Sequence, residues 1–346
     1  MDLSIALVLV QDGIVNGAIY GLLGLALVIV FTVTRIILVP IGEFVAYGAL
    51  TLAALETGAM PGTVWLLGGL ALASAAMRLL AARRPGGKAS LGRDLLAILL
   101  PPLAAGGLTL LALSLGAPQL VRVLLALLIV VPMGPYLYDI VYRPIAERSV
   151  LVLLIVSVAL HLAMLGLGLV FFGAEGSRTE SLADAALEIG PLFITGQSIV
   201  VMVVTLLLIA ALFLFFERSL IGKALRATAV NRLGARLVAI SPTLCGHVAF
   251  ALATAVGALA GILVSAVTTI YYDTGFVIAL KGFVAAIIGG MVSYPLAAAG
   301  ALLIGLVESF AAFGASAFKE VLVFMIIIPV LLWRSWQSGH VAEEEE

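Results

Sequence analysis

The feature that most constrains this chain is a succession of long apolar runs, separated by short polar breaks. A helix of about 20 apolar residues spans the hydrocarbon core of a bilayer. On that scale, about eleven such runs fit between residues 13 and 333. The pattern therefore predicts an all-α, polytopic transmembrane bundle of about 10–11 hydrophobic segments.

Composition decides between a membrane protein and a large soluble core. Only 11% of the 346 residues are charged and 63% are hydrophobic, whereas soluble domains carry about 25% charged residues. So few charges cannot cover a soluble surface, and no tract is polar and long enough to form a soluble domain. We therefore interpret residues 1–338 as one transmembrane domain and residues 339–346 as an acidic tail.

The basic residues predict the orientation of the chain, because cytoplasmic loops of membrane proteins are enriched in lysine and arginine. Alternating the apolar runs across the membrane puts every basic cluster on one side. These clusters are Arg35, residues 78–93, Arg143 with Arg148, residues 217–236, and Arg334. The N-terminus is then outside, the C-terminus is inside, and the acidic stretch of residues 173–196 is outside.

No motif for catalysis is visible in the chain. The sequence has no nucleophile elbow, no metal-ligand spacing and no phosphate-binding loop of the Walker type. Its one cysteine, Cys245, excludes a disulfide framework and a thiolate metal cluster. We therefore predict no enzymatic activity, no metal and no nucleic-acid partner. If transport is active, its energy comes from a partner protein or an ion gradient.

Ionisable residues inside apolar runs are functional candidates, because each costs several kcal/mol unless it is paired. Lys281 and Glu308 lie at similar depths in two successive runs that a short Ser-Tyr-Pro turn joins. We predict that they form an ion pair. The pair either fixes this hairpin or lines a translocation pathway, and the sequence does not choose between them. It also leaves open whether residues 276–313 form two spans or a re-entrant hairpin.

Glu43 is a second candidate for the pathway or its gate. It follows Pro40 and Gly42, which predict a broken helix. A broken helix at membrane depth usually faces protein or a water-filled cavity. Asn16 and Tyr20 lie one helical turn apart in the first run and form either a polar stripe toward the pathway or a packing face.

Three other polar or breaking features have more modest interpretations. Asp139 lies among tyrosines near the end of its run and is predicted to anchor the membrane interface. His161 lies in the middle of a run, which favours a hydrogen-bonded packing role. Pro132 and Pro135 predict a kink in the fifth run.

The break between residues 217 and 243 is strongly basic, yet it does not resemble a loose loop. Apolar residues from Leu225 to Ile240 recur at roughly helical spacing, and Gly222 and Pro242 mark the ends. The pattern predicts one short amphipathic helix at the cytoplasmic face. Such a helix either contacts anionic lipid or docks a cytoplasmic motor protein.

Part of this break resembles the cytoplasmic coupling loop of the branched-chain amino acid permeases of ABC importers. The segment reads RATAVNRLGARLVAI, from Arg226 to Ile240. The matching positions are Arg226, Ala227, Ala229, Asn231, Arg232, Ala235, Arg236, Leu237 and Ile240.

Other stretches extend this resemblance along most of the chain. They are NGAIYGLLGLAL at 16–27, GEF at 42–44, RPI at 143–145, KGFVAAIIGGMVSYPLA at 281–297, and the glycine and glutamate of 305–308. Residues 60–125 show no motif of the family. The sequence departs from the family pattern at residues 39–41, at two hairpin positions and at three loop positions. These departures leave the identity of the substrate open.

The resemblance implies a permease subunit of an ABC importer in the bacterial inner membrane. Its coupling residues would be Arg226, Ala227, Asn231, Arg232, Ala235 and Arg236. The implied partners are two cytoplasmic ATPase subunits, a second permease subunit that is homologous or identical, a periplasmic substrate-binding protein and membrane lipid. ATP would be bound by the partners, so no cofactor is expected on this chain. The substrate would be a branched-chain or related small amino acid, or a small amide.

Two other classes of protein stay open. One is a proton-coupled secondary transporter of small apolar solutes, which would use Glu43 or Asp139 and would need no ATPase. The other is a membrane scaffold that recruits a cytoplasmic partner through the basic break and transports nothing.

Overall fold

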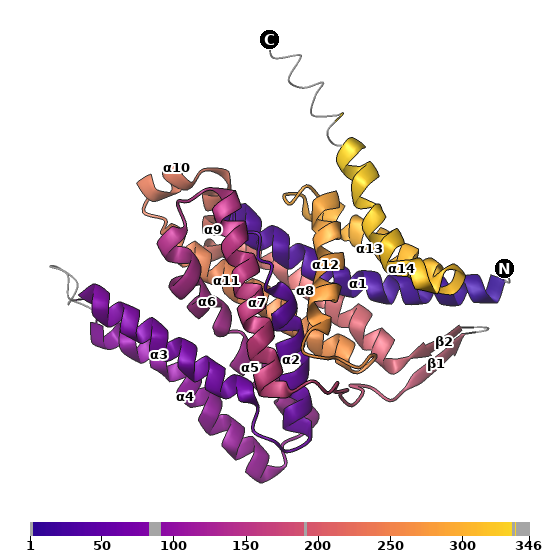
Figure 1. Ribbon diagram of the computed structural model, residues 1–346, viewed down its shortest axis with the longest axis horizontal. Coiled ribbons are helices and arrows are strands. Elements are labelled where there is room, and N and C mark those ends of the chain that lie inside the picture. The colour runs from indigo at the N-terminus through magenta and orange to yellow at the C-terminus, as the bar shows by residue number, and fades with distance from the viewer. Residues whose placement is uncertain (1–2, 83–90, 190–191, 334–335, 337–346) are drawn as a thin grey trace.

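The computed structural model describes residues 3–82, 91–189, 192–333 and 336, and within them it is a bundle of helices (Figure 1). Nine segments of this part of the chain are long and apolar enough to cross a bilayer. The longer helices are α1 (Leu3–Thr34), α2 (Ile41–Glu56), α3 (Gly62–Ala82), α4 (Leu91–Leu115), α5 (Gln119–Val130), α7 (Val150–Phe172), α8 (Gly196–Arg218), α11 (Pro242–Ser265), α12 (Thr274–Ile288) and α13 (Tyr294–Gly314). The predicted all-α, polytopic bundle is thereby confirmed, whereas the side on which each terminus lies stays a prediction.

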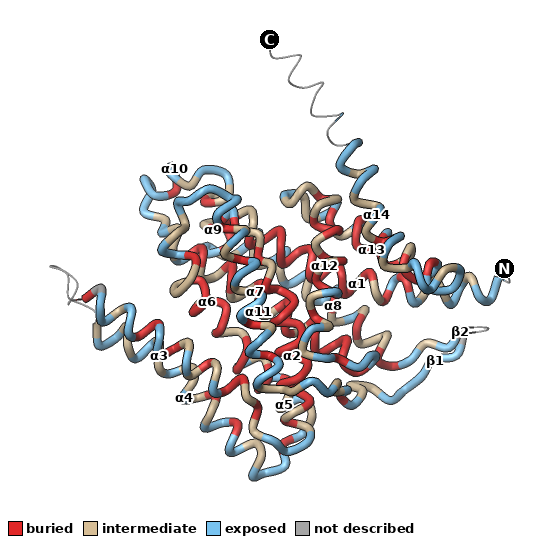
Figure 2. The backbone as a smooth tube through the Cα atoms, viewed as in Figure 1, coloured by how far each residue is buried: buried red, intermediate tan, exposed pale blue. Residues whose placement is uncertain are grey.

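The core of the bundle is formed by α1, α2, α11, α12 and α13, as the buried residues in Figure 2 show. In α1, 78% of the membrane-spanning window is buried inside the protein, against 11% in α4. A helix that is apolar on all sides and is covered by protein belongs to the inside of a bundle. The hairpin of α3 and α4 extends from one side of this core (Figure 1).

Helix α1 packs along α13 at very short distance because small residues face each other. A Cβ atom added to Gly13 or Gly17 would lie 2.9 Å from the Cα atom of Leu306 or Leu302, respectively. Close approach of glycine-lined backbones is the usual way in which helices associate in lipid. The helix also begins at Leu3 and not near residue 13, where the first span was predicted to begin, so residues 3–12 are part of it.

The predicted interruption near Pro40 is present, but it lies before Gly42 and Glu43. Helix α1 ends before Arg35, which has a positive φ of 62°, and α2 begins at Ile41 after the turn at Pro40. Helices α2 and α12 have only 16 and 15 residues, fewer than the roughly 20 that span a bilayer. They pack on each other and on other core helices.

The fifth apolar run is bent where the prolines predict it. Helix α5 ends at Val130 and the short α6 (Met133–Leu137) follows Pro132. A π-helical turn (Tyr138–Tyr142) and a 3₁₀ turn (Arg143–Ile145) complete the run. The last span, Ser316–Trp333, contains a 3₁₀ turn (Ser316–Phe318) and α14 (Lys319–Met325).

Two polar breaks differ from the predicted ones. The acidic stretch of residues 173–196 contains an antiparallel hairpin of β1 (Ala186–Ile189) and β2 (Leu192–Thr195). The basic break forms two helices, α9 (Leu220–Val230) and α10 (Arg232–Leu237), so the prediction of a single helix was wrong.

The remaining predictions about the ends of the chain are not tested. The acidic tail of residues 339–346, Arg334 and part of the basic cluster at residues 78–93 lie outside the described residues. The division into one transmembrane domain over residues 1–338 and a tail stays a prediction for the same reason.

Candidate translocation and coupling sites

A buried cluster of charged groups lies where α1, α12, α13 and α14 meet. The Lys281 Nζ atom lies 2.5 Å from Glu308 Oε1 and 3.2 Å from Glu320 Oε1. The Tyr20 hydroxyl donates a hydrogen bond of 2.5 Å to Glu308 Oε2. Lys281 and Glu308 are buried, and a buried ion pair of this kind needs such additional hydrogen bonds to offset desolvation. The predicted ion pair is therefore confirmed, and its role stays a prediction.

This cluster contains two groups that the sequence analysis did not connect to the pair. Tyr20 was predicted to lie on a polar stripe or packing face, and it reaches Glu308. Glu320 was missed because it lies in the last span, at some distance along the chain, and only folding brings it to Lys281. One oxygen of Glu320, Oε2, is buried without a hydrogen-bond partner among the described residues.

Asn16 lies one turn before Tyr20 but is not part of the cluster. It is half-buried, and no hydrogen bond from its amide to the cluster is present among the described side chains. Gly24, one turn after Tyr20, faces α12, where an added Cβ would lie 3.1 Å from the Gly282 carbonyl oxygen. At Gly24 the helix face thus serves close packing, whereas the role of Asn16 stays a prediction.

Glu43 forms a second buried polar site, on α2. Its Oε1 atom lies 2.6 Å from Nδ1 of His161 on α7, and the His161 ring stacks on Phe276 with centroids 4.2 Å apart. The side chain of Glu43 is 1% exposed, and its Oε2 atom has no hydrogen-bond partner in the described part of the chain. The hydrogen bond predicted for His161 is present, and its partner is the candidate gating residue itself.

Asp139 lies between two basic groups on neighbouring elements. Its carboxylate oxygens lie 2.9 Å from Nη1 of Arg143 and 2.8 Å from Nε2 of His247. The side chain thereby connects the π-helical turn to α11. This geometry supports a structural connection near the end of the span.

The two helices of the basic break begin at side-chain caps. The Ser219 Oγ atom accepts a hydrogen bond from the Gly222 backbone N–H, and the Asn231 Oδ1 atom accepts one from Gly234, each at 2.8 Å. A polar side chain at this position satisfies a free backbone N–H of the first turn. Asn231 adopts an extended backbone with φ of −148°, and this conformation ends α9 and starts α10.

The inner side of α9 and α10 is held against the bundle by a few buried residues. Leu225 is fully buried against Ile29 and Val33 of α1 and Cys245 of α11. The Thr228 hydroxyl donates to Cys245 Sγ at 3.3 Å, and Ala235 is buried on α10. The two helices of the basic break are therefore packed against the bundle through these residues.

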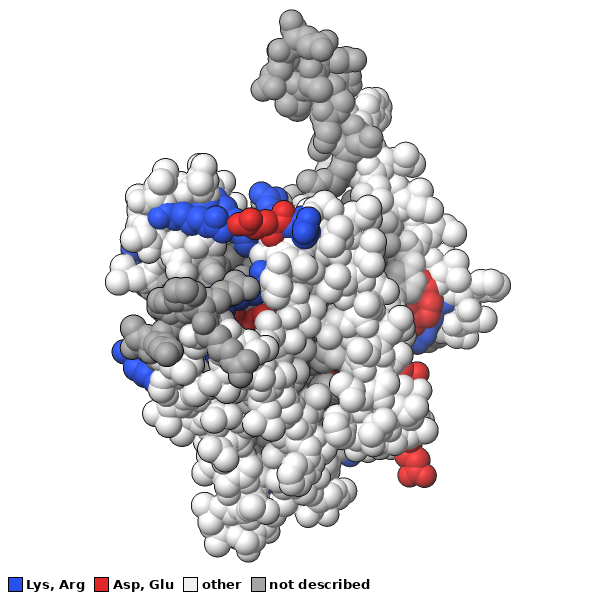
Figure 3. All heavy atoms as spheres, turned by 60° about the vertical axis from the view of Figure 1, so that its left-hand side comes forward, with Lys and Arg blue, Asp and Glu red and all other residues white. Residues whose placement is uncertain are grey.

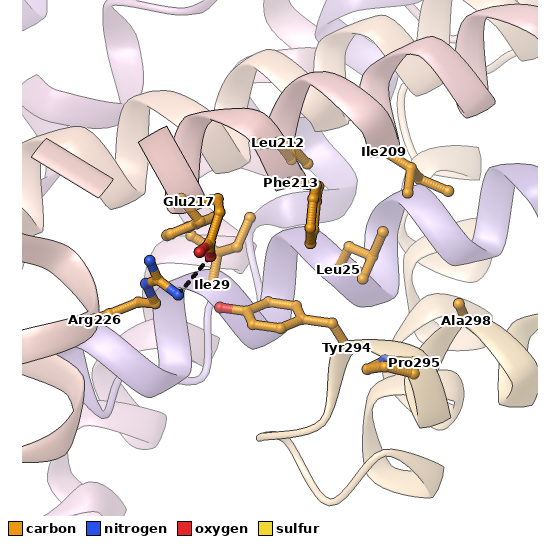
Figure 4. A pocket seen from close by; sticks show the side chains of 11 residues that line it. Leu25, Ile29, Ile209, Leu212, Phe213, Glu217, Arg226, Tyr294, Pro295 and Ala298 are labelled. Carbon is orange, nitrogen blue, oxygen red and sulfur yellow. Dashed lines mark hydrogen bonds and ion pairs between the residues drawn. The ribbon is translucent and has the colours of Figure 1, made fainter. Parts of the chain in front are cut away.

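Arg226 lies at one end of an apolar pocket of about 460 Å³ between α1, α8 and the start of α13 (Figure 4). Its Nη1 atom pairs with Glu217 Oε2 at 3.0 Å. Figure 4 also shows the Tyr294 side chain pointing toward this end of the pocket. The ion pair connects α9 to the end of α8.

Arg232 and Arg236 face the turn that precedes α7. Arg232 donates to the Ala146 carbonyl oxygen at 3.4 Å, and Arg236 Nη2 lies 3.3 Å from Glu147 Oε1. Large apolar side chains are also exposed on this segment, beside polar ones such as Lys223. Val230, Leu233 and Leu237 are 88%, 68% and 81% exposed. The apolar spacing predicted one amphipathic helix, whereas the chain forms two helices and leaves both leucines exposed.

The comparison with known proteins decides the family. Residues 90–331 match the family described as "Branched-chain amino acid transport system / permease component". The chain belongs to this family. The match includes residues 90–125, where no family motif had been visible, and it leaves α1, α2 and α3 outside. As a multi-pass permease-family protein, the chain is located in the bacterial inner membrane.

Several curated proteins are similar to this permease-family chain over part of their length. The branched-chain amino acid permease protein BraD of Pseudomonas aeruginosa is 30% identical over 201 residues, which are 56% of this chain and 65% of that protein. LivH of Escherichia coli is 29% identical over 198 residues, 55% of this chain and 64% of LivH. The matched region thus covers slightly less than two thirds of these relatives. No solved structure matches the chain.

Proposed function

We propose that this chain is the permease subunit of an ATP-driven ABC importer for branched-chain or related small amino acids, or small amides. Its family and the names of its curated relatives support this proposal. The observation that carries it is the pair of helices α9 and α10, which is anchored by Leu225 and exposes Val230, Leu233 and Leu237. Apolar residues exposed on a basic segment are typical of a surface that contacts a partner protein.

In this proposal the exposed side of α9 and α10 contacts a cytoplasmic ATPase subunit. Closure of two such ATPases would push the helices toward the membrane. Leu225 packs on both α1 and α11 and would transmit the displacement to them. A second permease subunit, identical or homologous, would complete the pathway, and a periplasmic binding protein would deliver the solute. The chain itself would need no cofactor and catalyse no reaction, because ATP would be hydrolysed by the partners.

The same proposal assigns the two buried polar sites to the pathway or its gate. The cluster of Tyr20, Lys281 and Glu308 connects α1 to α12 and α13, and Glu43 connects α2 to α7. Relative movement of these helices would have to break hydrogen bonds that are buried and charged. Each site would therefore favour discrete closed and open states. Asn16 is proposed to lie beside the same pathway.

The test is uptake by the complete complex, reconstituted in vesicles with the proposed ATPases, second permease and binding protein. We expect ATP-dependent uptake of labelled leucine. Leu233→Glu places a charge in the proposed interface without disturbing the core, because the side chain is 68% exposed. We expect it to lower ATPase co-purification and uptake about tenfold, as the loss of an apolar contact in an interface does. Leu233→Ile is the matched control and should retain both.

The outcome that contradicts the proposal is uptake driven by a pH gradient without ATPases. That result would support a proton-coupled secondary transporter. One observation favours this second function: Glu43 keeps a buried carboxyl oxygen without a partner among the described residues, where a proton could be carried. Unchanged co-purification of the ATPases with Leu233→Glu would show that α10 is not the contact.

A further inference from the structure

A pocket of about 530 Å³ lies between α10, the turn before α7 and the start of α11. Four arginines line it: Arg143 and Arg148 from the turn, and Arg232 and Arg236 from α10. Glu147 is the carboxylate among the lining residues. Positive charge is therefore in excess inside a concave site. Figure 3 shows basic side chains in a band near one end of the molecule, with acidic side chains among them and a broad, mostly uncharged surface below.

The arginines are only partly satisfied by the chain itself. Arg143 is paired with Asp139, and Arg236 lies 3.3 Å from Glu147. Arg232 reaches a carbonyl oxygen at 3.4 Å, and its Nε atom is buried without an acceptor among the described residues. Arg148 has no carboxylate partner in the same part of the chain. Free N–H donors of several guanidinium groups converge on one space, which is the arrangement that binds a phosphate group.

The position of the pocket indicates the source of that phosphate. Three membrane-spanning segments end at the pocket: one ends at Ile145, one begins at Val150 and one begins at Pro242. The pocket therefore lies at the depth of lipid headgroups. Directly beside it, Leu151 of α7 and Leu244 of α11 are 66% and 55% exposed. These apolar surfaces would accept the acyl chains of a molecule whose headgroup occupies the pocket.

We propose that the arginine pocket between α10 and the turn before α7 binds the phosphate group of an anionic phospholipid. Basic pockets between membrane helices at the cytoplasmic side bind such headgroups in other proteins. The lipid would bridge α10 to the turn of residues 143–148 and so fix the coupling segment. This role is separate from the proposed ATPase contact, because the arginines face the pocket whereas Leu233 and Leu237 face away from the bundle.

Native mass spectrometry of the purified full chain, without ATPases, tests the proposal. The lipid-stripped protein is titrated with dioleoylphosphatidylglycerol, with dioleoylphosphatidylcholine, and with soluble glycerol 3-phosphate. We expect preferential binding of phosphatidylglycerol. Arg148→Gln should weaken it about tenfold, because a hydrogen bond to a charged phosphate is lost. Arg148→Gln with Arg232→Gln should weaken it further.

The matched control is Arg218→Gln. Arg218 is an exposed arginine at the end of α8, in the same basic segment, and does not line the pocket. The Arg218→Gln variant should bind phosphatidylglycerol as tightly as the unchanged protein does. If Arg218→Gln weakens phosphatidylglycerol binding as much as Arg148→Gln does, the lipid responds only to net charge. If phosphatidylcholine binds as tightly as phosphatidylglycerol, the headgroup is not recognised. Displacement of the lipid by glycerol 3-phosphate at similar concentration would identify a soluble phosphate ligand. Each of these three results overturns the proposal.

Discussion

Helices α11 and α4 are nearly equal in length and mean hydropathy but occupy opposite places in the molecule. They have 24 and 25 residues. In α11, 72% of the membrane-spanning window is buried inside the protein, against 11% in α4. Either sequence predicts a membrane span equally well. The difference shows that hydropathy identifies a span without indicating whether protein or lipid surrounds it.

The physical reason lies in the small residues of the two helices. In α11, Gly261 lies so close to the backbone of Val45 in α2 that a Cβ atom could not fit. In α4, Gly107 has open space around it. Lipid chains are as apolar as leucine, so the hydrophobic effect does not draw two helices together inside the membrane. Close backbone approach does, and α11 has it along α2.

The largest expected effect comes from filling these glycines. Gly261→Leu should destabilise the protein by about 3 kcal/mol, because the backbones of α11 and α2 would be forced apart. Gly107→Leu should leave stability unchanged. Thermal unfolding in detergent, followed by loss of the monodisperse peak in size-exclusion chromatography, measures both. If the two variants unfold at the same temperature, close packing is not what separates α11 from α4.

The next largest difference in stability is expected between replacement of a buried lysine, Lys281, and replacement of a half-exposed one, Lys319. Lys281→Met would leave Glu308 buried without its cation, at a cost of about 3 kcal/mol. Lys319 lies next to this cluster, 3.9 Å from Glu320, but 41% of its side chain is exposed. Lys319→Met should therefore change stability by less than about 1 kcal/mol.

Unfolding in detergent over a series of sodium dodecyl sulfate fractions compares the two lysine variants. The double variant Lys281→Met with Glu308→Gln should recover part of the lost stability, because it removes the unpaired charge. A double variant that is less stable than Lys281→Met alone would contradict the description of the cluster as an ion pair.

The smallest difference in stability is expected between variants that remove one of two buried threonine hydroxyls. Thr63 of α3 forms a hydrogen bond of 2.8 Å with Thr51 of α2, and hydrogen bonds between membrane helices contribute about 0.6 kcal/mol. Thr109 of α4 donates to Ala105 of its own helix at 2.7 Å. Thr63→Val should cost about that amount, whereas Thr109→Val should be close to neutral, since such back-bonding does not stabilise a helix. The same unfolding series measures both, and an equal cost would show that Thr63 adds nothing by joining two helices.

Much of the architecture could be predicted from local sequence. The number of apolar runs, the bend at Pro132 and the break before Ile41 all follow from residues that are close together in the chain. The pair of Lys281 and Glu308 could be predicted because a short turn joins their helices. The residues resembling a coupling loop indicated the family, and the family match confirmed it.

The partners that complete each site could not be predicted. Tyr20 reaches Glu308, and His161 reaches Glu43, from helices that are far apart in sequence, and Glu320 joins the same cluster from the last span. No periodicity encodes such contacts, because they depend on which helices approach one another. The split of the basic break at Asn231 was missed because apolar spacing alone did not distinguish one helix from two.

The sequence by itself determined that this chain crosses a membrane many times and where its charges lie, because hydropathy and charge are local properties. Only the tertiary structure decided which spans are covered by protein and which side chains complete the buried polar sites, such as Tyr20 at Glu308 and His161 at Glu43. Inside a membrane an apolar side chain gains little by exchanging lipid for protein. The arrangement therefore depends on the fit of small residues such as Gly261, and on the need of buried charges such as Lys281 for a partner.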